Sequence, residues 1–271
     1  MQSLEYLIPL EKKVEYLDAL LKVGFDTVEL GSIVSPRLIP QMADTLEVLD
    51  KLDYSSIRSN RMILVVNKKG AEIIAERESV THISYPFSIS PQFLKMNLNT
   101  TSAKSLDTIK EILEICEKKK KEAVIYISMA FGNTFGDEWS IEILFTWINI
   151  LYTMGVRTIP LSNVSVEINS AQITKVFSGL IPLFPEIRFG LHLHTTNRGW
   201  YENVKAAYEN GCRRFDGVIH GWGGCPMSGN ELLGNLKTEN LLAYLDQNHL
   251  PIDIDLDALD RAYTLASMTF H

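Results

Sequence analysis

Two histidines, two positions apart, are the residues whose spacing is best suited to chemistry. His192 and His194 end an apolar run that begins at Ile187, and polar residues follow them. Residues two apart on a strand share one face, so both imidazoles can point in the same direction. Imidazole pairs suit divalent transition metals, and added oxygen ligands would admit magnesium or manganese. The spacing therefore indicates a metal site. The alternative is a pair of polar histidines whose ring nitrogens are satisfied by backbone hydrogen bonds.

A second candidate is the glycine-rich segment from Gly221 to Pro226, which carries Cys225. Three glycines and a terminal proline predict a loop with unusual backbone dihedral angles, and such a loop can hold a thiol over a pocket. A free, half-buried cysteine is the alternative. Further along the chain, Asn235 offers an amide oxygen as a metal ligand, and Glu239 lies at a predicted helix start. Glu239 could equally be an ordinary first-turn acid stabilised by the helix dipole.

The elements around these residues alternate between amphipathic helices and short apolar strands. The spacing predicts helices such as 10–23, 102–120 and 141–154, with Ser102 or Ser105 as the cap of the second. Strict alternation means a parallel sheet, because each parallel crossover needs a covering helix. We therefore expect an α/β protein of the (β/α)8 TIM-barrel type. No linker divides the chain, so residues 1–271 are expected to form one domain.

The strand count falls one short of a closed barrel. The apolar runs predict seven strands, and a strand ahead of Leu10 would be needed to complete eight. The opening residues Met1 to Pro9 do not supply one. Either the barrel is open or the given chain lacks its first strand, and we expect the gap to lie between the strands that start near Thr27 and Arg214.

Barrel enzymes place their chemistry at the carboxyl ends of their strands. The predicted strand ends carry Glu29, Ser128, Asn163, His192 and His194. These side chains are expected to meet at one mouth of the barrel, and we assign Ser128 and Asn163 to substrate binding.

Composition excludes several partners. Twenty-six basic against 33 acidic side chains give a net charge of −7, which argues against nucleic-acid binding. The basic run Lys118 to Lys121 ends a predicted helix and favours a solvated last turn.

No apolar stretch is long enough to span a membrane, and the start does not resemble a secretory signal. Three widely spaced cysteines do not indicate a disulfide framework. We expect a cytoplasmic protein.

Several segments together resemble the 3-hydroxy-3-methylglutaryl-CoA lyases, members of the metal-dependent aldolase-like barrels. The similarity runs from Gly24 to Leu245, nearly the whole chain. The matching segments are Gly24 to Glu29, Val34 to Pro36, Pro40 to Asp44, Phe93 to Asn99, Tyr126 to Phe131, His192 to His194, Gly221 to Pro226, Gly234 to Leu236 and Thr238-Glu239. The GxGGCP loop is specific to the lyase branch.

The resemblance implies a role for each matching residue. His192, His194 and Asn235 would bind a divalent cation, magnesium or manganese. Cys225 would be the active-site cysteine that donates a proton to the product enolate, with Glu29 and Glu239 as catalytic acids nearby. The substrate would be an acyl-CoA, cleaved to acetyl-CoA and acetoacetate in leucine or ketone-body metabolism. A homodimer stays open.

The chain also departs from the family pattern. The family's first strand ends in an Arg-Asp pair, and Met1 to Ser3 resemble the residues that follow it. Asn163 and Thr195 stand where the family has aspartates, and a neutral amide cannot act as a carboxylate base. Two alternatives therefore stay open. One is a related aldol-type lyase for another acyl-CoA or keto acid, and the other is a catalytically silent barrel that only binds an acyl-CoA or a partner.

Overall fold

The computed structural model describes residues 6–164, 167–196, 198–223 and 234–270. Within them, seven parallel strands form one curled sheet in the order β1-β2-β3-β4-β5-β6-β8. The strands are β1 (Thr27–Ile33), β2 (Asn60–Val65), β3 (His82–Ser88), β4 (Glu122–Ser128), β5 (Thr158–Ser162), β6 (Arg188–His192) and β8 (Arg214–Asp216). A separate antiparallel pair joins β7 (His194–Thr195) to β9 (Gly234–Asn235).

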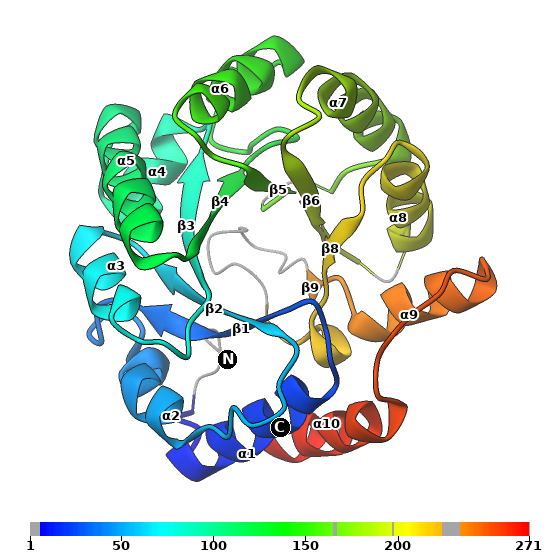
Figure 1. The fold of residues 1–271 in the computed structure, drawn as a ribbon. Helices are drawn as coiled ribbons and strands as arrows, with labels where there is room; N and C mark the ends of the chain where they lie inside the picture. The colour runs from blue at the N-terminus through cyan, green and yellow to red at the C-terminus, as the bar shows by residue number, and fades with distance from the viewer. Residues whose placement is uncertain (1–5, 165–166, 197, 224–233, 271) are drawn as a thin grey trace.

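Helices surround the convex face of this sheet (Figure 1). They are α1 (Leu10–Lys22), α2 (Thr45–Lys51), α3 (Lys68–Ala75), α4 (Pro91–Leu98), α5 (Ser102–Lys119), α6 (Ile141–Thr153), α7 (Ser170–Leu183), α8 (Trp200–Glu209), α9 (Thr238–Gln247) and α10 (Leu256–Thr269). Two short 3-10 helices are η1 (Pro40–Met42) and η2 (Ile219–Gly221). This arrangement confirms the predicted barrel type.

The edges of the sheet lie where the strand count placed them. Among the described residues, β1 pairs on one side with β2, and β8 pairs on one side with β6. In Figure 1 the curl of the sheet is therefore open between β1 and β8, and α10 packs beside α1 below this opening. Tyr16 and Phe270 join these two helices through an edge-on ring contact with centroids 4.9 Å apart.

The parallel register decides which side chains face the helices and which face the barrel interior. Ile127 pairs with Leu161, and Leu161 with Leu191, and all three are fully buried in the core beneath the helices. Their neighbours one position on, Ser128, Ser162 and His192, must therefore point to the concave side. The core thus lies between sheet and helices, and polar side chains are left for the interior.

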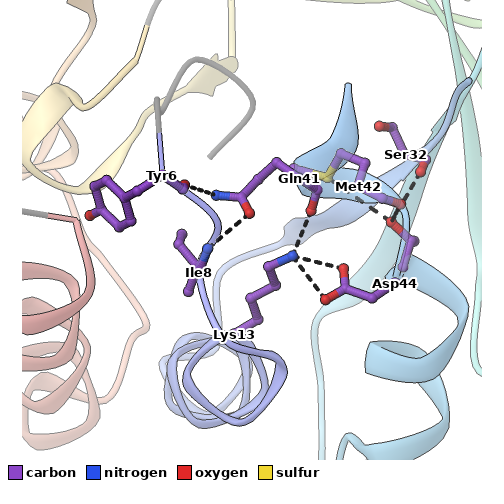
Figure 2. Close-up of polar contacts among 8 residues, drawn as sticks. Tyr6, Ile8, Lys13, Ser32, Gln41, Met42 and Asp44 are labelled. Atoms are coloured by element: carbon purple, nitrogen blue, oxygen red, sulfur yellow. Dashed lines mark hydrogen bonds and ion pairs between the residues drawn. The ribbon is translucent and has the colours of Figure 1, made fainter. Parts of the chain in front are cut away.

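A polar cluster, shown in Figure 2, holds the edge strand β1 in place. Lys13 of α1 is buried, and its Nζ donates to the Gln41 carbonyl at 2.5 Å and to both Asp44 carboxylate oxygens at 2.7 and 2.9 Å. The Gln41 amide donates to the Tyr6 carbonyl and accepts from the Ile8 N–H. Since the Thr45 hydroxyl also donates to the Ser32 carbonyl, one cluster ties residues 6–8, α1 and β1 together.

Candidate functional site

Polar side chains from four strands converge inside the curled sheet. The register links Glu29 of β1 to Met62 of β2, and it links His192 of β6 to Asp216 of β8. Tyr126 of β4 reaches across the interior, because its hydroxyl donates to Asp216 Oδ2 at 2.9 Å. Its ring meets that of His192 edge-on, with centroids 5.6 Å apart. Glu29, Tyr126, His192 and Asp216, together with Arg214, are called the interior cluster below.

His192 is oriented by Asp216. Its Nδ1 lies 3.1 Å from Asp216 Oδ2, the oxygen that also accepts from Tyr126. When Nδ1 carries the proton, it donates to the carboxylate and leaves the Nε2 lone pair for another partner. A carboxylate behind an imidazole is the usual outer support of a metal-binding histidine.

The groups around Asp216 favour its ionised form, which the orientation of His192 requires. Desolvation raises the pKa of Asp216, but the His192 hydrogen bond and the Arg214 charge outweigh it, so that the pKa lies below its usual value. Desolvation and the Asp216 charge together raise the pKa of Tyr126 well above its ordinary range. An ionised Asp216 therefore accepts hydrogen bonds from a protonated Tyr126 and from His192.

Glu29 is the acid of the interior cluster that can change protonation near neutral pH. Desolvation raises its pKa to about 7, while His192 lowers it and Asp216 raises it. Glu29 as a whole residue is nevertheless exposed, so solvent screening reduces this rise. A carboxyl group with such a pKa can take up and release a proton at neutral pH, as general acid–base catalysis requires.

His194 does not continue the strand that carries His192. Strand β6 ends at His192, and His194 begins β7, where it pairs directly with Asn235 of β9. The two imidazoles still lie close together, with ring centroids 5.1 Å apart. The antiparallel pair thus brings Asn235, which is distant in sequence, beside the two histidines.

Asn163 fixes the backbone of His194. Its Nδ2 donates to the His194 carbonyl at 2.7 Å, and its Oδ1 accepts from the His194 N–H at 2.8 Å. Asn163 is completely buried, so the structure uses its amide as a strand-like partner of His194. An aspartate could accept the N–H but could not donate to the carbonyl, which gives the asparagine a physical reason. Its assignment to substrate binding remains a prediction.

His192, His194 and Asn235 fit a divalent cation in their chemistry and spacing. A metal–nitrogen distance of about 2.0–2.1 Å puts each ring centroid about 3.2 Å from the ion, and two bound imidazoles then have centroids about 4.5–5.2 Å apart. The observed 5.1 Å lies in that range. Asn235 Nδ2 donates to the Trp222 carbonyl, which leaves Oδ1 as the oxygen that can face an ion.

The described residues offer this ion little negative charge. Among them, no group of three or more histidine, cysteine, aspartate and glutamate side chains could hold a metal ion. Two imidazoles and one neutral amide form a partial ligand set, so the metal assignment remains a prediction.

Glu239 contacts the chain just before the glycine-rich loop. Its two carboxylate oxygens accept from the backbone N–H of His220 at 3.0 and 3.1 Å, and Oε1 lies 2.6 Å from His220 Nδ1. The other ring nitrogen, Nε2, lies 3.0 Å from the Ser267 hydroxyl. His220 has a left-handed backbone, φ 58°, which costs energy in a residue with a side chain. Glu239 thus secures a strained turn between β8 and the loop.

The remaining predicted residues divide between described and undescribed parts of the chain. Ser128 ends β4 on the concave side and is buried beside Ser88, whose hydroxyl donates to the Ser128 carbonyl at 3.0 Å. Cys225 lies outside the described residues, as do 224–233 as a whole. The catalytic role of Cys225 and the substrate-binding role of Ser128 both remain predictions.

The sequence analysis did not single out Tyr126, Arg214 or Asp216 as site residues. The sequence did contain a usable signal, because alternate residues of the strand predicted to start near Arg214 share a face, and residues 214 and 216 are two apart. Which face that is depends on the register with β6, and the sequence does not reveal that register.

Comparisons with known proteins identify the family to which the chain belongs. The HMGL-like family model matches residues 1–265. A hydroxymethylglutaryl-CoA lyase of Bacillus subtilis is 26% identical over 96% of this chain and 86% of its own length, and an (R)-citramalyl-CoA lyase of Chloroflexus aurantiacus is 27% identical over 95% and 83%. The solved structure of an HMG-CoA lyase from Acenitobacter baumannii, in complex with coenzyme A and 3-methylmalate, is 30% identical. It superposes with a TM-score of 0.90 and covers 100% of this chain and 88% of that one.

The described parts of the chain contain no helix long and apolar enough to cross a membrane. A family match over almost the full length, together with relatives that are lyases, settles the class of the protein. The chain belongs to the HMGL-like family and is a carbon–carbon lyase.

Proposed function

We propose that the chain cleaves 3-hydroxy-3-methylglutaryl-CoA to acetyl-CoA and acetoacetate with the help of a magnesium or manganese ion. The observation that carries this proposal is the close approach of His192, His194 and Asn235 in an HMGL-like chain, with Glu29 near enough for its charge to interact with His192. Hydroxymethylglutaryl-CoA lyases among the relatives support the same substrate.

The reaction is a retro-aldol cleavage. A base removes the proton of the substrate's tertiary hydroxyl, the neighbouring carbon–carbon bond breaks, and its electron pair passes to the thioester enolate, which then takes up a proton. A bound divalent cation would act as a Lewis acid that makes the hydroxyl proton easier to remove. His192, His194 and Asn235 would hold that ion.

The protein's own residues would move the two protons. With its pKa near 7, the Glu29 carboxylate is suited to accept the hydroxyl proton in the barrel interior. Cys225 is our candidate donor to the enolate carbon. Glu239 contributes as a positioning residue, because its carboxylate is engaged by His220 rather than open to substrate.

The second candidate is the cleavage of citramalyl-CoA, which the Chloroflexus aurantiacus relative favours. Both substrates carry a tertiary hydroxyl next to the bond that breaks. Citramalyl-CoA would release pyruvate in place of acetoacetate, so the second product tells them apart.

The test supplies each thioester separately, with magnesium or manganese, and measures acetoacetate and pyruvate. We expect acetoacetate from the first substrate, at a rate that Glu29→Gln lowers about 10²–10⁴-fold. In His192→Ala, the cleavage rate should no longer depend on the metal concentration. Lys237→Ala, a change outside the interior cluster, serves as the control. Pyruvate from citramalyl-CoA alone would establish the second candidate, and no cleavage of either would favour another acyl-CoA.

We also propose that the protein acts in the cytoplasm, in leucine or ketone-body metabolism, and as a homodimer. Fractionation of the source cells and the hydrodynamic mass of the purified chain test the first and last of these. Accumulation of 3-hydroxy-3-methylglutaryl-CoA after deletion of the gene tests the second.

A further inference from the structure

Arg214 is a buried cation on the concave face of β8, two residues before Asp216. Its side chain is 10% exposed, and its Nε lies 3.5 Å from Asp216 Oδ1. Within the described residues, Nε and Nη1 are buried and have no hydrogen-bond partner. Burying an arginine costs free energy unless a nearby charge offsets it, and Asp216 and Tyr126 supply that environment.

Gly190 makes room for this arginine. The two residues are direct partners in the register of β6 and β8. A Cβ added at Gly190 would lie 2.9 Å from Arg214 Cδ and 3.0 Å from Cγ, both too close. The stem of Arg214 therefore lies across the bare backbone of β6, one layer below His192. The three atoms nearest to that added Cβ all belong to Arg214.

The contacts of Asp216 divide between its two oxygens. Oδ2 receives the Tyr126 hydroxyl and faces His192 Nδ1, while Oδ1 faces Arg214. Rotation of this carboxylate about its terminal torsion would take Oδ1 away from the guanidinium charge, which lies at ion-pair distance, or Oδ2 away from its hydrogen-bond partners. Arg214 thus restricts the very carboxylate that orients His192.

We propose that Arg214 is a positioning residue that, through Asp216, holds His192 in the tautomer whose Nε2 lone pair faces the metal and substrate site. Gly190 is the second residue that this arrangement requires, because any side chain there displaces the arginine. The proposal rests on the proposed function only for the use of Nε2 as a metal ligand. The orientation itself is a property of the chain without metal or substrate.

The first experiment measures the tautomer of His192 by nitrogen-15 NMR of the metal-free protein at pH 8. The signal is assigned by its loss in His192→Gln. In the parent chain we expect a protonated Nδ1 and an unprotonated Nε2. In Arg214→Met, which keeps the stem and removes the guanidinium, we expect a mixture of both tautomers.

A second readout is manganese affinity, followed by electron paramagnetic resonance of the free ion. Loss of an outer support of a metal ligand typically lowers affinity about 10–100-fold, and we expect that range for Arg214→Met. Arg188→Met is the matched control. Arg188 is on the same face of β6, pairs with Glu122 at 2.9 Å and does not contact Asp216 in any described interaction. It should change neither readout.

Gly190→Ala tests the same proposal while the arginine is still present. Its backbone does not require glycine, so alanine should fold, and the added methyl group should shift the His192 tautomer in the same direction as Arg214→Met. An unchanged tautomer in folded Arg214→Met would overturn the proposal. If that variant does not fold, an unchanged tautomer in Gly190→Ala overturns it instead. Because the tautomer is read without substrate, a chain inactive on 3-hydroxy-3-methylglutaryl-CoA can still pass this test.

Discussion

At the scale of single residues, Asn163 offers the clearest test of the structure. Its amide both accepts from and donates to the backbone of His194, at 2.8 and 2.7 Å, in a fully buried position. Asn163→Asp would set a carboxylate oxygen against the His194 carbonyl. We expect this to lower the free energy of unfolding by about 1–3 kcal/mol, measured by urea denaturation, because a buried acceptor loses its donor.

Asn169→Asp is the matched control for that change. Asn169 caps α7 by accepting from the Gln172 N–H at 3.0 Å, and aspartate is as good an N-cap as asparagine. The same chemical change should therefore be nearly neutral there. Equal stability of the two variants would show that the donor of Asn163 is dispensable.

Glu29 gives a prediction about pH. Its folded pKa of about 7 lies above the ordinary 4.5 of a glutamate, so the protonated form is favoured by folding. The stability that Glu29 contributes is fully present below about pH 4.5 and is lost as pH rises to about 7. The parent chain should thus lose stability relative to Glu29→Gln across this window and no further above it. Urea denaturation at half-unit pH steps checks this, and a parent chain that holds or gains stability relative to Glu29→Gln across this window would contradict the raised pKa.

Sequence reasoning found those site residues whose position at a strand end is visible in the chain itself. His192 and Ser128 are the last residues of β6 and β4, as predicted, whereas Glu29 is the third of the seven residues of β1, because that strand continues to Ile33. Arg214 and Asp216 were missed because their importance arises from β6 and β8 lying side by side. A single sequence shows which residues of a strand share one face, but it does not show which residues of the neighbouring strand they pair with.

At the scale of elements, those helices and strands that depend on a local sequence pattern were predicted, and the pairing between distant segments was not. The strands and long helices follow from local apolar periodicity and agree with the structure to within a few residues. The cap of α5 is Thr101, not Ser102 or Ser105, because its side chain accepts from Lys104 N–H. The short helix α4 went unrecognised, although Ser90 and Pro91 form a good helix start. The β7–β9 pair joins residues about 40 apart, which no local pattern reveals.

The cluster around Lys13 gives the prediction for this scale. Lys13→Met removes the cation that Asp44 and the Gln41 carbonyl share, and it loosens the link between α1 and the segment that supports β1. Since the lysine is buried while Asp44 is partly exposed, we expect a loss of about 1–3 kcal/mol in unfolding free energy.

Lys12→Met at the adjacent position is the control. Lys12 makes an exposed ion pair with Glu15 at 3.6 Å, and such pairs contribute about 0–1 kcal/mol. Thermal or urea unfolding of both variants makes the comparison. If Lys12→Met cost as much as Lys13→Met, general surface charge, and not the buried cluster, would be what stabilises α1.

At the scale of the whole molecule, the open curl of the sheet predicts uneven stability. Strand β4 pairs with β3 on one side and β5 on the other, and four of its seven residues are buried. Among the described residues, β1 and β8 each have one strand partner, so part of their backbone N–H groups lack a ladder bond. Backbone groups at such edges can open to solvent without unfolding of the whole sheet.

Hydrogen exchange followed by mass spectrometry measures this directly. We expect peptides covering β4 to exchange slowest, and those covering β1 and β8 to exchange faster, at a rate less sensitive to mild denaturant because only local opening is needed. The interior cluster spans both edges, with Glu29 on β1 and Asp216 on β8. Binding of manganese by His192, His194 and Asn235 should therefore slow exchange in β8 more than in β4. Equal protection of β1, β8 and β4 before metal is added would mean that further chain covers the two edges, and the site would then be enclosed by more than these seven strands.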